Sequence, residues 1–212
     1  MNASWDGHYG SGKSELFFPD ENLVRLMKRR MAAGGIKDPV TADIGCGSGR
    51  HLKLFEDLGI TRIVGTDISH RGLVSCKKNF RAPLVQSDNR TLAMKSSSID
   101  IAVAWGSLHY AAKDELPVML GEIHRVLRPE GRVFATLRSF RDTYLKKGRH
   151  LGNDTWITDL SDISGSIVSF YSESEVREAF SIFKSCSIGL IERTIMGNLD
   201  QVLSHWVIDA EK

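Results

Sequence analysis

The sequence predicts an α/β fold with a doubly wound sheet of seven strands, mostly parallel, that ends in an antiparallel C-terminal strand. The first observation is that short apolar runs alternate with amphipathic helical patterns from residue 40 to residue 137. This β-α-β rhythm favours parallel strands with helices on both faces of the sheet. The second observation is that two late apolar runs follow one another at short spacing. Such a pair is typical of an antiparallel hairpin at a sheet edge.

The apolar spacing predicts each element in turn. We expect strands at 40–44, 62–67, 83–87, 99–105, 132–137, 187–193 and 202–208. We expect helices at 19–31, 50–58, 69–80 and 116–127, and a further helix after Ser172. Ser69 is the expected N-cap of the third helix, and Gly59 the expected C-cap of the second. Ser172 and Glu175 have the spacing of a capping box, which marks the start of the last helix.

The composition is that of a single globular domain over residues 1–212. Hydrophobic residues make up 42% and charged residues 25% of the chain, and the net charge of +2 disfavours a nucleic-acid partner. Three scattered cysteines without a C-x-x-C pair argue against disulfides and a metal site. The sequence has neither a signal-peptide core nor a run of the ~18 apolar residues that a membrane span needs. We therefore expect a cytoplasmic protein with no bound metal and no membrane partner.

Two segments outside the β-α-β pattern are expected to cover a site. Residues 1–35 form an N-terminal flap and helix, because aromatic residues, Trp5 and Tyr9 among them, alternate with glycines ahead of the first helical pattern. Residues 139–170 are polar and poorly periodic, and we interpret them as an insertion or lid. Segments of this length inside a domain are usually functional or disordered.

The segment Asp43–Gly49 (DIGCGSG) carries the strongest functional signal. It lies between an expected strand and an expected helix, where glycines allow a tight turn and the helix N-terminus offers free N–H groups. A dinucleotide fingerprint, G-x-G-x-x-G, would have glycine where this chain has Arg50. Arg50 therefore disfavours a nicotinamide dinucleotide and favours an adenosine ligand without phosphates. Asp43 in the same turn suits a ligand amino group.

Polar residues follow the next three expected strands. Asp67 ends the second strand, the sequence Ser87-Asp88-Asn89 ends the third, and Trp105 to Tyr110 (WGSLHY) ends the fourth. In an open α/β sheet the ligand binds beyond the carboxyl ends of the strands, so these groups are expected to meet. A carboxylate at Asp67 suits the two hydroxyls of a ribose, and the polar corner at Asp88 suits a purine edge.

Together these motifs resemble the class I S-adenosylmethionine-dependent methyltransferases. The resemblance covers residues 40–139 and includes DIGCGSG, GTDIS at 65–69, the Asp88 corner, IDIAVAWGSLHY at 99–110 and EIHRVLRPEGRVF at 122–134. It implies a Rossmann-like fold, S-adenosylmethionine as cofactor and S-adenosylhomocysteine as product. The cofactor-binding residues that it implies, with their neighbours, are Tyr9, Asp43, Gly45, Cys46, Gly47, Gly49, Asp67, Ile68, Asp88, Asn89 and Trp105.

The resemblance is strongest to enzymes that methylate oxygen or nitrogen of a small-molecule acceptor. The Asn-Pro-Pro-Tyr type of motif found in amino methyltransferases that act on bases and amides is absent after the fourth expected strand. Methyl transfer from a sulfonium is a direct displacement, so alignment supplies most of the acceleration and a base is needed only for a protonated acceptor. His109 is the candidate for that base. An RNA methyltransferase and a non-catalytic S-adenosylmethionine-binding protein remain alternatives, and the oligomeric state is open.

Overall fold

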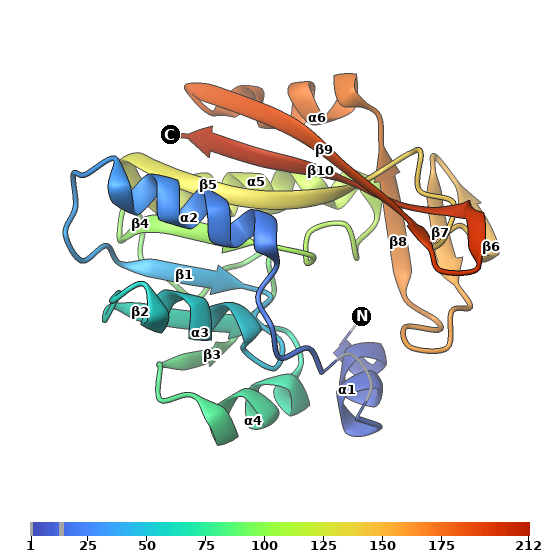
Figure 1. Ribbon diagram of the computed structural model, residues 1–212, viewed down its shortest axis with the longest axis horizontal. Coiled ribbons are helices and arrows are strands. Elements are labelled where there is room, and N and C mark those ends of the chain that lie inside the picture. Colours follow the sequence, from blue (N-terminus) through green and yellow to red (C-terminus); the bar gives the residue numbers. More distant parts are fainter. Residues whose placement is uncertain (1, 13–14) are drawn as a thin grey trace.

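The computed structural model describes residues 2–12 and 15–212, so positions 1, 13 and 14 of the predicted flap lie outside the described residues. Within the described chain, ten strands form one mixed sheet with the order β3-β2-β1-β4-β5-β8-β7-β6, and β10 pairs with β5 and with β9 (Figure 1). The predicted fold class is confirmed. All seven expected strands are present, and three further strands lie inside the expected insertion.

The parallel part of the sheet contains the first five strands. Their bounds are β1 Thr41–Ile44, β2 Ile63–Asp67, β3 Leu84–Gln86, β4 Ile99–Ala104 and β5 Leu127–Ser139. The late strands are β6 Gly148–Gly152, β7 Thr155–Thr158, β8 Ile167–Tyr171, β9 Ser185–Ile195 and β10 Asn198–Glu211. As predicted, the C-terminal strand β10 runs antiparallel to β5 and forms an antiparallel hairpin with β9.

The helices from α2 onward match the expected pattern, and α1 forms within the segment that was expected to be a flap. They are α1 Asn2–Gly10, α2 Glu21–Ala32, α3 Arg50–Asp57, α4 His70–Asn79, α5 Leu116–Val126 and α6 Glu173–Ala179, with short 3-10 turns η1 Lys113–Glu115 and η2 Phe180–Ile182. Ser69 caps α4 by accepting the Gly72 N–H, as predicted. The expected first helix starts later than position 19, because Asp20 is its N-cap. None of the described helices has both the length and the apolar character to cross a membrane.

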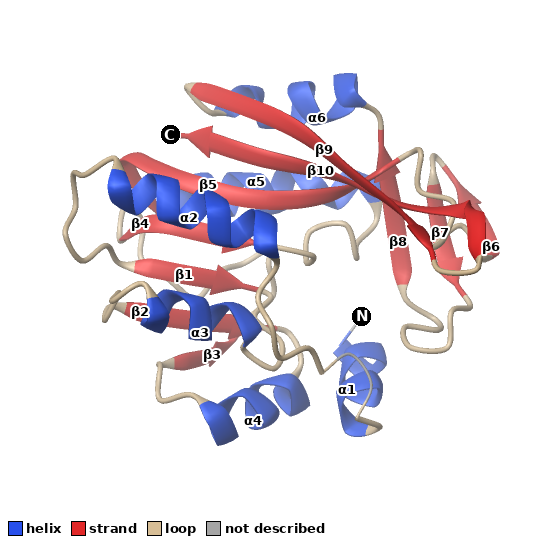
Figure 2. Ribbon diagram, in the orientation of Figure 1, coloured by secondary structure: helices blue, strands red, loops and turns tan. Residues whose placement is uncertain are grey.

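Helices cover both faces of the sheet, as Figure 2 shows. One face packs α2, α3 and part of α4 against the strands through a cluster that includes Leu23, Phe55 and Cys76. The other face packs α5 and α6 through a cluster that includes Leu120 and Val176. Both clusters are fully closed to solvent at these positions. Burial on two faces explains the continuous apolar character of β4.

The expected insertion is a three-stranded antiparallel meander, β6-β7-β8, rather than irregular chain. Strand β4 pairs with β5 as far as Ala135, and beyond that point β8 takes its place beside β5. The meander has a small apolar cluster of its own, formed by Leu145, Val168 and Phe170. It therefore extends the sheet past the carboxyl ends of the parallel strands.

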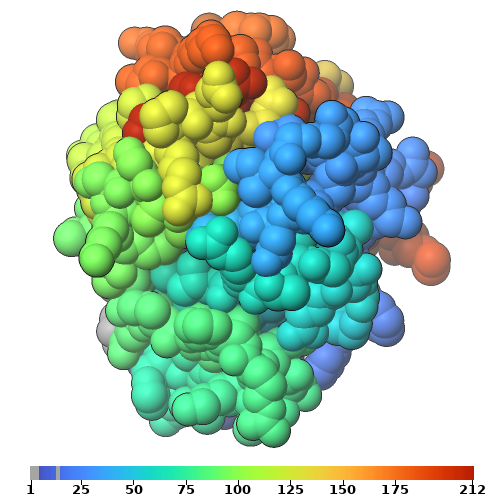
Figure 3. Space-filling view, turned by 90° about the vertical axis from the view of Figure 1, so that its left-hand side faces the viewer, coloured from blue at the N-terminus to red at the C-terminus, as the bar shows by residue number. Residues whose placement is uncertain are grey.

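The two ends of the parallel strands differ. At the amino ends, shown in Figure 3, the connecting segments of the first two thirds of the chain lie side by side in blue, green and yellow. At the carboxyl ends, α1 lies on one side and the β6-β8 meander on the other (Figure 1). Between α1 and the meander lie the glycine turn and the strand ends that the sequence marks as the site.

Candidate active site

The glycine turn between β1 and α3 has a backbone that only glycine adopts easily. Gly45, Gly47 and Gly49 have φ angles of 78°, 53° and 95°. The N–H groups of Gly45 and Cys46 donate to the Thr66 carbonyl at 2.7 and 2.8 Å, which fixes the turn to β2. A Cβ at Gly49 would lie 2.6 Å from the Cys76 sulfur. This glycine therefore allows α3 to pack on α4.

Asp67, the acid at the end of β2, is bound to the glycine turn. Its carboxylate accepts the N–H of Gly47 and the N–H of Ser69, each at 2.8 Å. Burial raises the pKa of Asp67 to about 6, although these two hydrogen bonds act in the opposite direction. The side chain also lines a pocket at the sheet edge. Asp67, the acid predicted to bind the ribose, therefore lies at this pocket and is fixed by two backbone hydrogen-bond donors.

Asp43 is a buried carboxylate without hydrogen-bond partners. Its exposed fraction is 1%, and neither oxygen accepts a hydrogen bond from any residue in the described part of the chain. The nearest ring nitrogen, Nδ1 of His51, lies 3.9 Å away. A buried and unpaired carboxylate is costly, so it fits a ligand that brings a cationic donor. The ammonium group of the predicted cofactor is such a donor.

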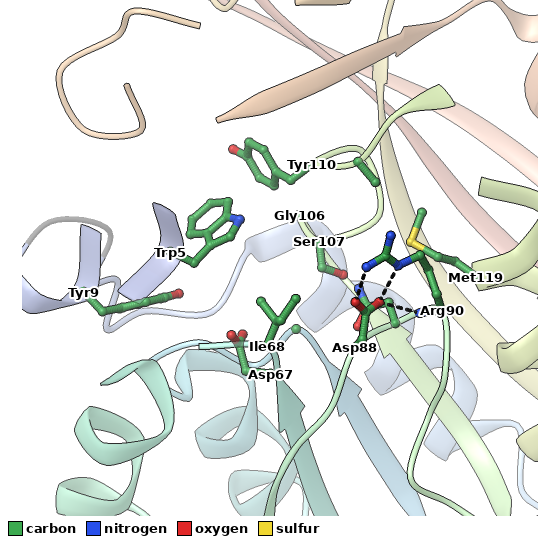
Figure 4. A pocket seen from close by; sticks show the side chains of 13 residues that line it. Trp5, Tyr9, Asp67, Ile68, Asp88, Arg90, Gly106, Ser107, Tyr110 and Met119 are labelled. Atoms are coloured by element: carbon green, nitrogen blue, oxygen red, sulfur yellow. Dashed lines mark hydrogen bonds and ion pairs between the residues drawn. The ribbon is translucent and has the colours of Figure 1, made fainter. Parts of the chain in front are cut away.

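A pocket of about 80 Å³ lies over the ends of β2, β3 and β4. Figure 4 shows Asp67 and Ile68 on one side of it and Asp88 on the other. Asp88 accepts hydrogen bonds from the Arg90 side chain at 2.9 and 2.5 Å, and this guanidinium lowers its pKa. Asn89 lines the same pocket. The structure thus brings Ile68, Asp88 and Asn89 together with Asp67, as the motifs predict, and adds Arg90 as a partner of Asp88.

Helix α1 covers the turn and the pocket. A Cβ on Gly47 would lie 2.1 Å from the Tyr9 hydroxyl oxygen, so this ring rests on the glycine turn. Trp5 makes an edge contact with Tyr110 at 4.9 Å between ring centroids. Asp6 accepts the Ser69 hydroxyl at 2.7 Å, and His8 contacts the Ser166 hydroxyl at 3.1 Å. The N-terminal segment is therefore attached to α4 on one side and to the chain before β8 on the other.

A second cavity, of about 740 Å³, adjoins the first pocket. Trp5, Tyr9, Gly45, Gly106 and Tyr110 line both spaces. Its far wall is made by β5, β9 and β10, and the chain between β7 and β8 contributes Asp162 and Ile163. The small pocket lies beside the residues predicted to bind adenosine, so it suits a cofactor. The larger cavity lies beyond the fourth strand and suits an acceptor.

His109, the predicted catalytic residue, lines the larger cavity. Its Nδ1 lies 3.4 Å from the Thr136 carbonyl oxygen, and because a carbonyl only accepts, this nitrogen carries the proton. The Nε2 atom then keeps its lone pair. Burial, followed by the charge of Arg138, holds the pKa of His109 well below 6.5. The ring is therefore neutral at neutral pH.

Five of the predicted cofactor-binding residues do not line the small pocket. Cys46 and Trp105 line the larger cavity, and Trp105 packs in the core cluster with α2. Asp43, Gly47 and Gly49 line neither space, because each is covered: Asp43 by the turn against His51, Gly47 by Tyr9 and Gly49 by α4. Among the described residues, no group of three or more His, Cys, Asp and Glu side chains is arranged to hold a metal ion.

Several lining residues were not among the predicted site residues. Tyr110 and Met119 line the small pocket, and Arg138, Arg193 and His205 line the larger cavity. The three basic side chains come from β5, β9 and β10, and the pairing of β5 with β10 joins Arg138 to His205, far apart in the sequence. The sequence shows these residues only as parts of strands, so no local signal marks them.

The sequence and the fold were both compared with those of known proteins. Residues 42–135 match a methyltransferase domain family. The mitochondrial arginine-hydroxylase NDUFAF5 of Danio rerio is 31% identical over 94 residues, which are 44% of this chain and 29% of that protein. The tRNA (carboxymethyluridine(34)-5-O)-methyltransferase of Macaca fascicularis is 29% identical over 143 residues, which are 66% of this chain and 20% of that protein. The chain spans less than a third of the length of either curated relative.

Solved structures share the fold over most of the chain. A methyltransferase of Methanosarcina mazei, described as S-adenosylmethionine-dependent, has a TM-score of 0.70 at 20% identity and covers 86% of this chain and 96% of its own. The 1,6-didemethyltoxoflavin-N1-methyltransferase of Burkholderia thailandensis, solved with its acceptor and S-adenosylhomocysteine, has a TM-score of 0.65 at 18% identity and covers 91% and 77%. The family match spans the strands and the glycine turn that build the small pocket, and solved S-adenosylmethionine-dependent methyltransferases share the fold, so residues 42–135 form a methyltransferase domain.

Proposed function

We propose that this chain transfers the methyl group of S-adenosylmethionine to an oxygen or nitrogen atom of a small-molecule acceptor held in the larger cavity. The observation that carries the proposal is the pair of adjoining spaces, one over Asp67 and one beside His109, separated by a shared wall at Gly45 and Gly106. A solved structure with the same fold holds 1,6-didemethyltoxoflavin and S-adenosylhomocysteine together, which supports a site for two ligands.

The described residues fit the cofactor in three ways. Asp67 presents a buried carboxylate toward the small pocket, Asp43 has two oxygens without a protein donor, and the glycine turn allows close approach of a ligand. We propose that Asp67 accepts the ribose hydroxyls and that Asp43, which lines neither space, attracts the ammonium group by its charge, with Asp88 and Asn89 beside the adenine. Tyr9, Gly45, Cys46, Ile68 and Trp105 are proposed to complete the contacts. When bound, the cofactor supplies a methyl group on a sulfonium sulfur, which the acceptor lone pair displaces to leave S-adenosylhomocysteine.

The chain contributes position and a proton acceptor to the transfer. Alignment of the acceptor with the methyl group is worth several orders of magnitude in rate. We propose that residues 1–35 act as a flap and residues 139–170 as a lid that exclude water. The contact between His8 and Ser166 and the place of Ile163 in the cavity wall support that role. With its own proton on Nδ1, His109 accepts on Nε2 the proton that leaves the acceptor.

Calorimetry with three ligands tests the cofactor part of the proposal. We expect S-adenosylmethionine and S-adenosylhomocysteine to bind the protein and NAD not to bind. Asp67→Ala is expected to abolish this binding, and Asp57→Ala, an exposed carboxylate at the far end of α3, is expected to leave it unchanged. Binding of NAD alone would contradict the proposal. Cofactor binding without product from a broad acceptor panel would favour a non-catalytic binding protein.

An RNA acceptor is the second candidate, because curated relatives of this chain methylate tRNA. The net charge of +2 favours a small molecule over RNA, and so does the place of the cavity between α1 and the chain that joins β7 to β8. Radiolabelled methyl transfer to total tRNA, compared with transfer to a small-molecule extract, separates the two. We also propose a cytoplasmic location, for which the three free thiols are the supporting observation.

A further inference from the structure

One face of the β5-β10-β9 ribbon forms a wall of the larger cavity. Residues two apart on a strand share a face, and directly paired residues on neighbouring strands share it as well. His205 on β10 pairs with Arg138 on β5, and Leu203 on β10 pairs with Arg193 on β9. The register therefore places Arg138, His205 and Arg193 on the same face, and all three line the cavity.

Arg138 has hydrogen-bonding capacity that the protein leaves unused. Its exposed fraction is 7%, and its Nη1 donates to Asp142 at 2.8 Å. Asp142 also accepts the N–H groups of Leu145 and Ser204, so this carboxylate holds three donors. The Nε atom of Arg138 is buried and meets no acceptor in the described part of the chain. A buried guanidinium donor without a partner is costly unless a ligand supplies an acceptor.

The surroundings of His205 are positive. Burial first, and then the charges of Arg138, Arg193 and Arg50, lower the pKa of this histidine to about 3. Arg138 pairs with Asp142, and the charges of Asp20 and Asp43 act on Arg50. The neighbouring Glu192 pairs with Arg141, and Arg193 takes part in no ion pair with a described residue.

The carboxylates of the cavity lie on other segments. Glu15 binds the Ser75 hydroxyl at 2.5 Å, and Asp20 accepts the Asn22 N–H as the N-cap of α2. Asp162 belongs to the chain between β7 and β8. Negative charge thus gathers near the N-terminal segment and the loop, and positive charge gathers on the strand wall.

We propose that the methyl acceptor carries an anionic oxygen group, a carboxylate or a phosphate, which Arg138 and Arg193 bind on the face of β5, β10 and β9. This inference rests on the proposed function, because it places the acceptor in the larger cavity. Guanidinium groups bind such anions through charge-assisted and often bidentate hydrogen bonds.

Three probes of similar size test the proposal: benzoate, phenyl phosphate and neutral benzamide. Each is titrated calorimetrically into the protein, with and without saturating S-adenosylhomocysteine. We expect at least one anion to bind about tenfold or more tightly than benzamide, since charge-assisted hydrogen bonds are roughly twice as strong as neutral ones. The stronger of the two anions identifies the group as a carboxylate or a phosphate. Equal binding of benzamide, or no binding of either anion, overturns the proposal.

Variants locate the anion. Arg193 is exposed on β9, so Arg193→Gln is expected to fold and to weaken the preferred anion about fivefold or more, with partial recovery in Arg193→Lys. Arg81→Gln, an exposed arginine just before β3 at the amino edge of the sheet, is the matched control and is expected to change nothing. Unchanged anion binding in Arg193→Gln contradicts the proposal. If S-adenosylhomocysteine does not bind, the proposed function is contradicted. The anion site is then still tested by the titrations made in the absence of S-adenosylhomocysteine.

Discussion

The Asp67 carboxylate accepts the backbone N–H of Gly47 at 2.8 Å, so the acid that ends β2 and the glycine turn that follows β1 form one hydrogen-bonded unit. The second oxygen of Asp67 accepts the Ser69 N–H at the start of α4. One buried side chain therefore links β1, β2 and α4 at the point where the cofactor is proposed to bind. A change in the charge of Asp67 is expected to affect both stability and ligand affinity.

The stability effect of Asp67 has a definite sign. The pKa of Asp67 is about 6 in the folded protein and about 3.9 in an unfolded chain. The folded state therefore binds the proton more tightly, and the stabilisation is fully present below pH ~3.9 and is lost as the pH rises through about 6. Relative to Asp67→Asn, the wild-type free energy of unfolding is expected to fall by about 2 kcal/mol between pH 4 and pH 7. Urea unfolding at several pH values measures it, and a pH-independent difference would contradict the prediction.

The affinity for S-adenosylhomocysteine is expected to follow the ionisation of Asp67. Ribose hydroxyls donate to the carboxylate form, so affinity falls about tenfold for each pH unit below 6. In Asp67→Asn the affinity is expected to be low and independent of pH in this range. Asp57→Asn, on the exposed end of α3, is the control and keeps the wild-type profile. Calorimetry between pH 5 and pH 8 makes the measurement.

Gly47→Ala is expected to destabilise the protein by about 2 kcal/mol or more, because its φ of 53° is left-handed and the new Cβ meets the Tyr9 hydroxyl. Adding Tyr9→Ala to Gly47→Ala removes the contact between the new Cβ and the tyrosine but leaves the strained backbone. The double variant is therefore expected to recover part of the lost stability. Gly121→Ala is the control: Gly121 lies inside α5, and its Cβ would meet nothing within 4 Å. This control is expected to stabilise by up to about 1 kcal/mol. No recovery from Tyr9→Ala would mean that the contact is unimportant.

His109→Gln is expected to lower kcat by about 10²–10⁴-fold for an acceptor that loses a proton, the range for a general base. Because the pKa of His109 lies well below 6.5, the wild-type rate is expected to show no His109 inflection above neutral pH. Steady-state kinetics from pH 6 to pH 9 measure both values, with His150→Gln on β6 as the exposed control. An unchanged kcat with a higher KM would assign His109 to acceptor binding, and no change in either would contradict the prediction.

Ser172→Ala is expected to cost about 1 kcal/mol of stability by removing the N-cap of α6. Ser172 accepts the Glu175 N–H at 3.3 Å, and Glu175 accepts the Ser172 N–H at 2.7 Å. Glu175 also pairs with Lys113, so the serine is the cleaner position to change. Ser181→Ala, exposed in η2, is the control. Thermal melting compares the two variants, and equal melting temperatures would show that the cap adds nothing.

Most of the fold was predictable because its signals are local. The caps at Ser69 and Ser172 act within three or four residues, and the strands of the parallel sheet are apolar on both faces. The cofactor half of the site was predictable for a related reason. Each of its acids follows a strand directly, and the carboxyl ends of parallel strands meet at one edge.

The rest depends on contacts between distant residues. The β6-β8 meander lacks a clear alternation because two of its strands pack only a small cluster, so the sequence suggested an irregular insertion. The alignment of Arg138 with His205 follows from the register of β5 and β10, which no local pattern encodes. The pairing of Arg90 with Asp88 was not predicted, because the sequence analysis matched the polar corner at Asp88 to a purine edge.

The wall that the two pockets share has a kinetic consequence. Asp67 lines only the small pocket and Arg193 only the larger cavity, so variants there are expected to change one Michaelis constant each. Trp5 and Tyr110 line both, and a substitution at either alters the two constants together. Acceptor preference can therefore diverge through β9 and β10 with the nucleoside side unchanged. A substitution at Trp5 or Tyr110 affects the binding of both ligands, so we expect these two positions to vary less than the residues of β9 and β10.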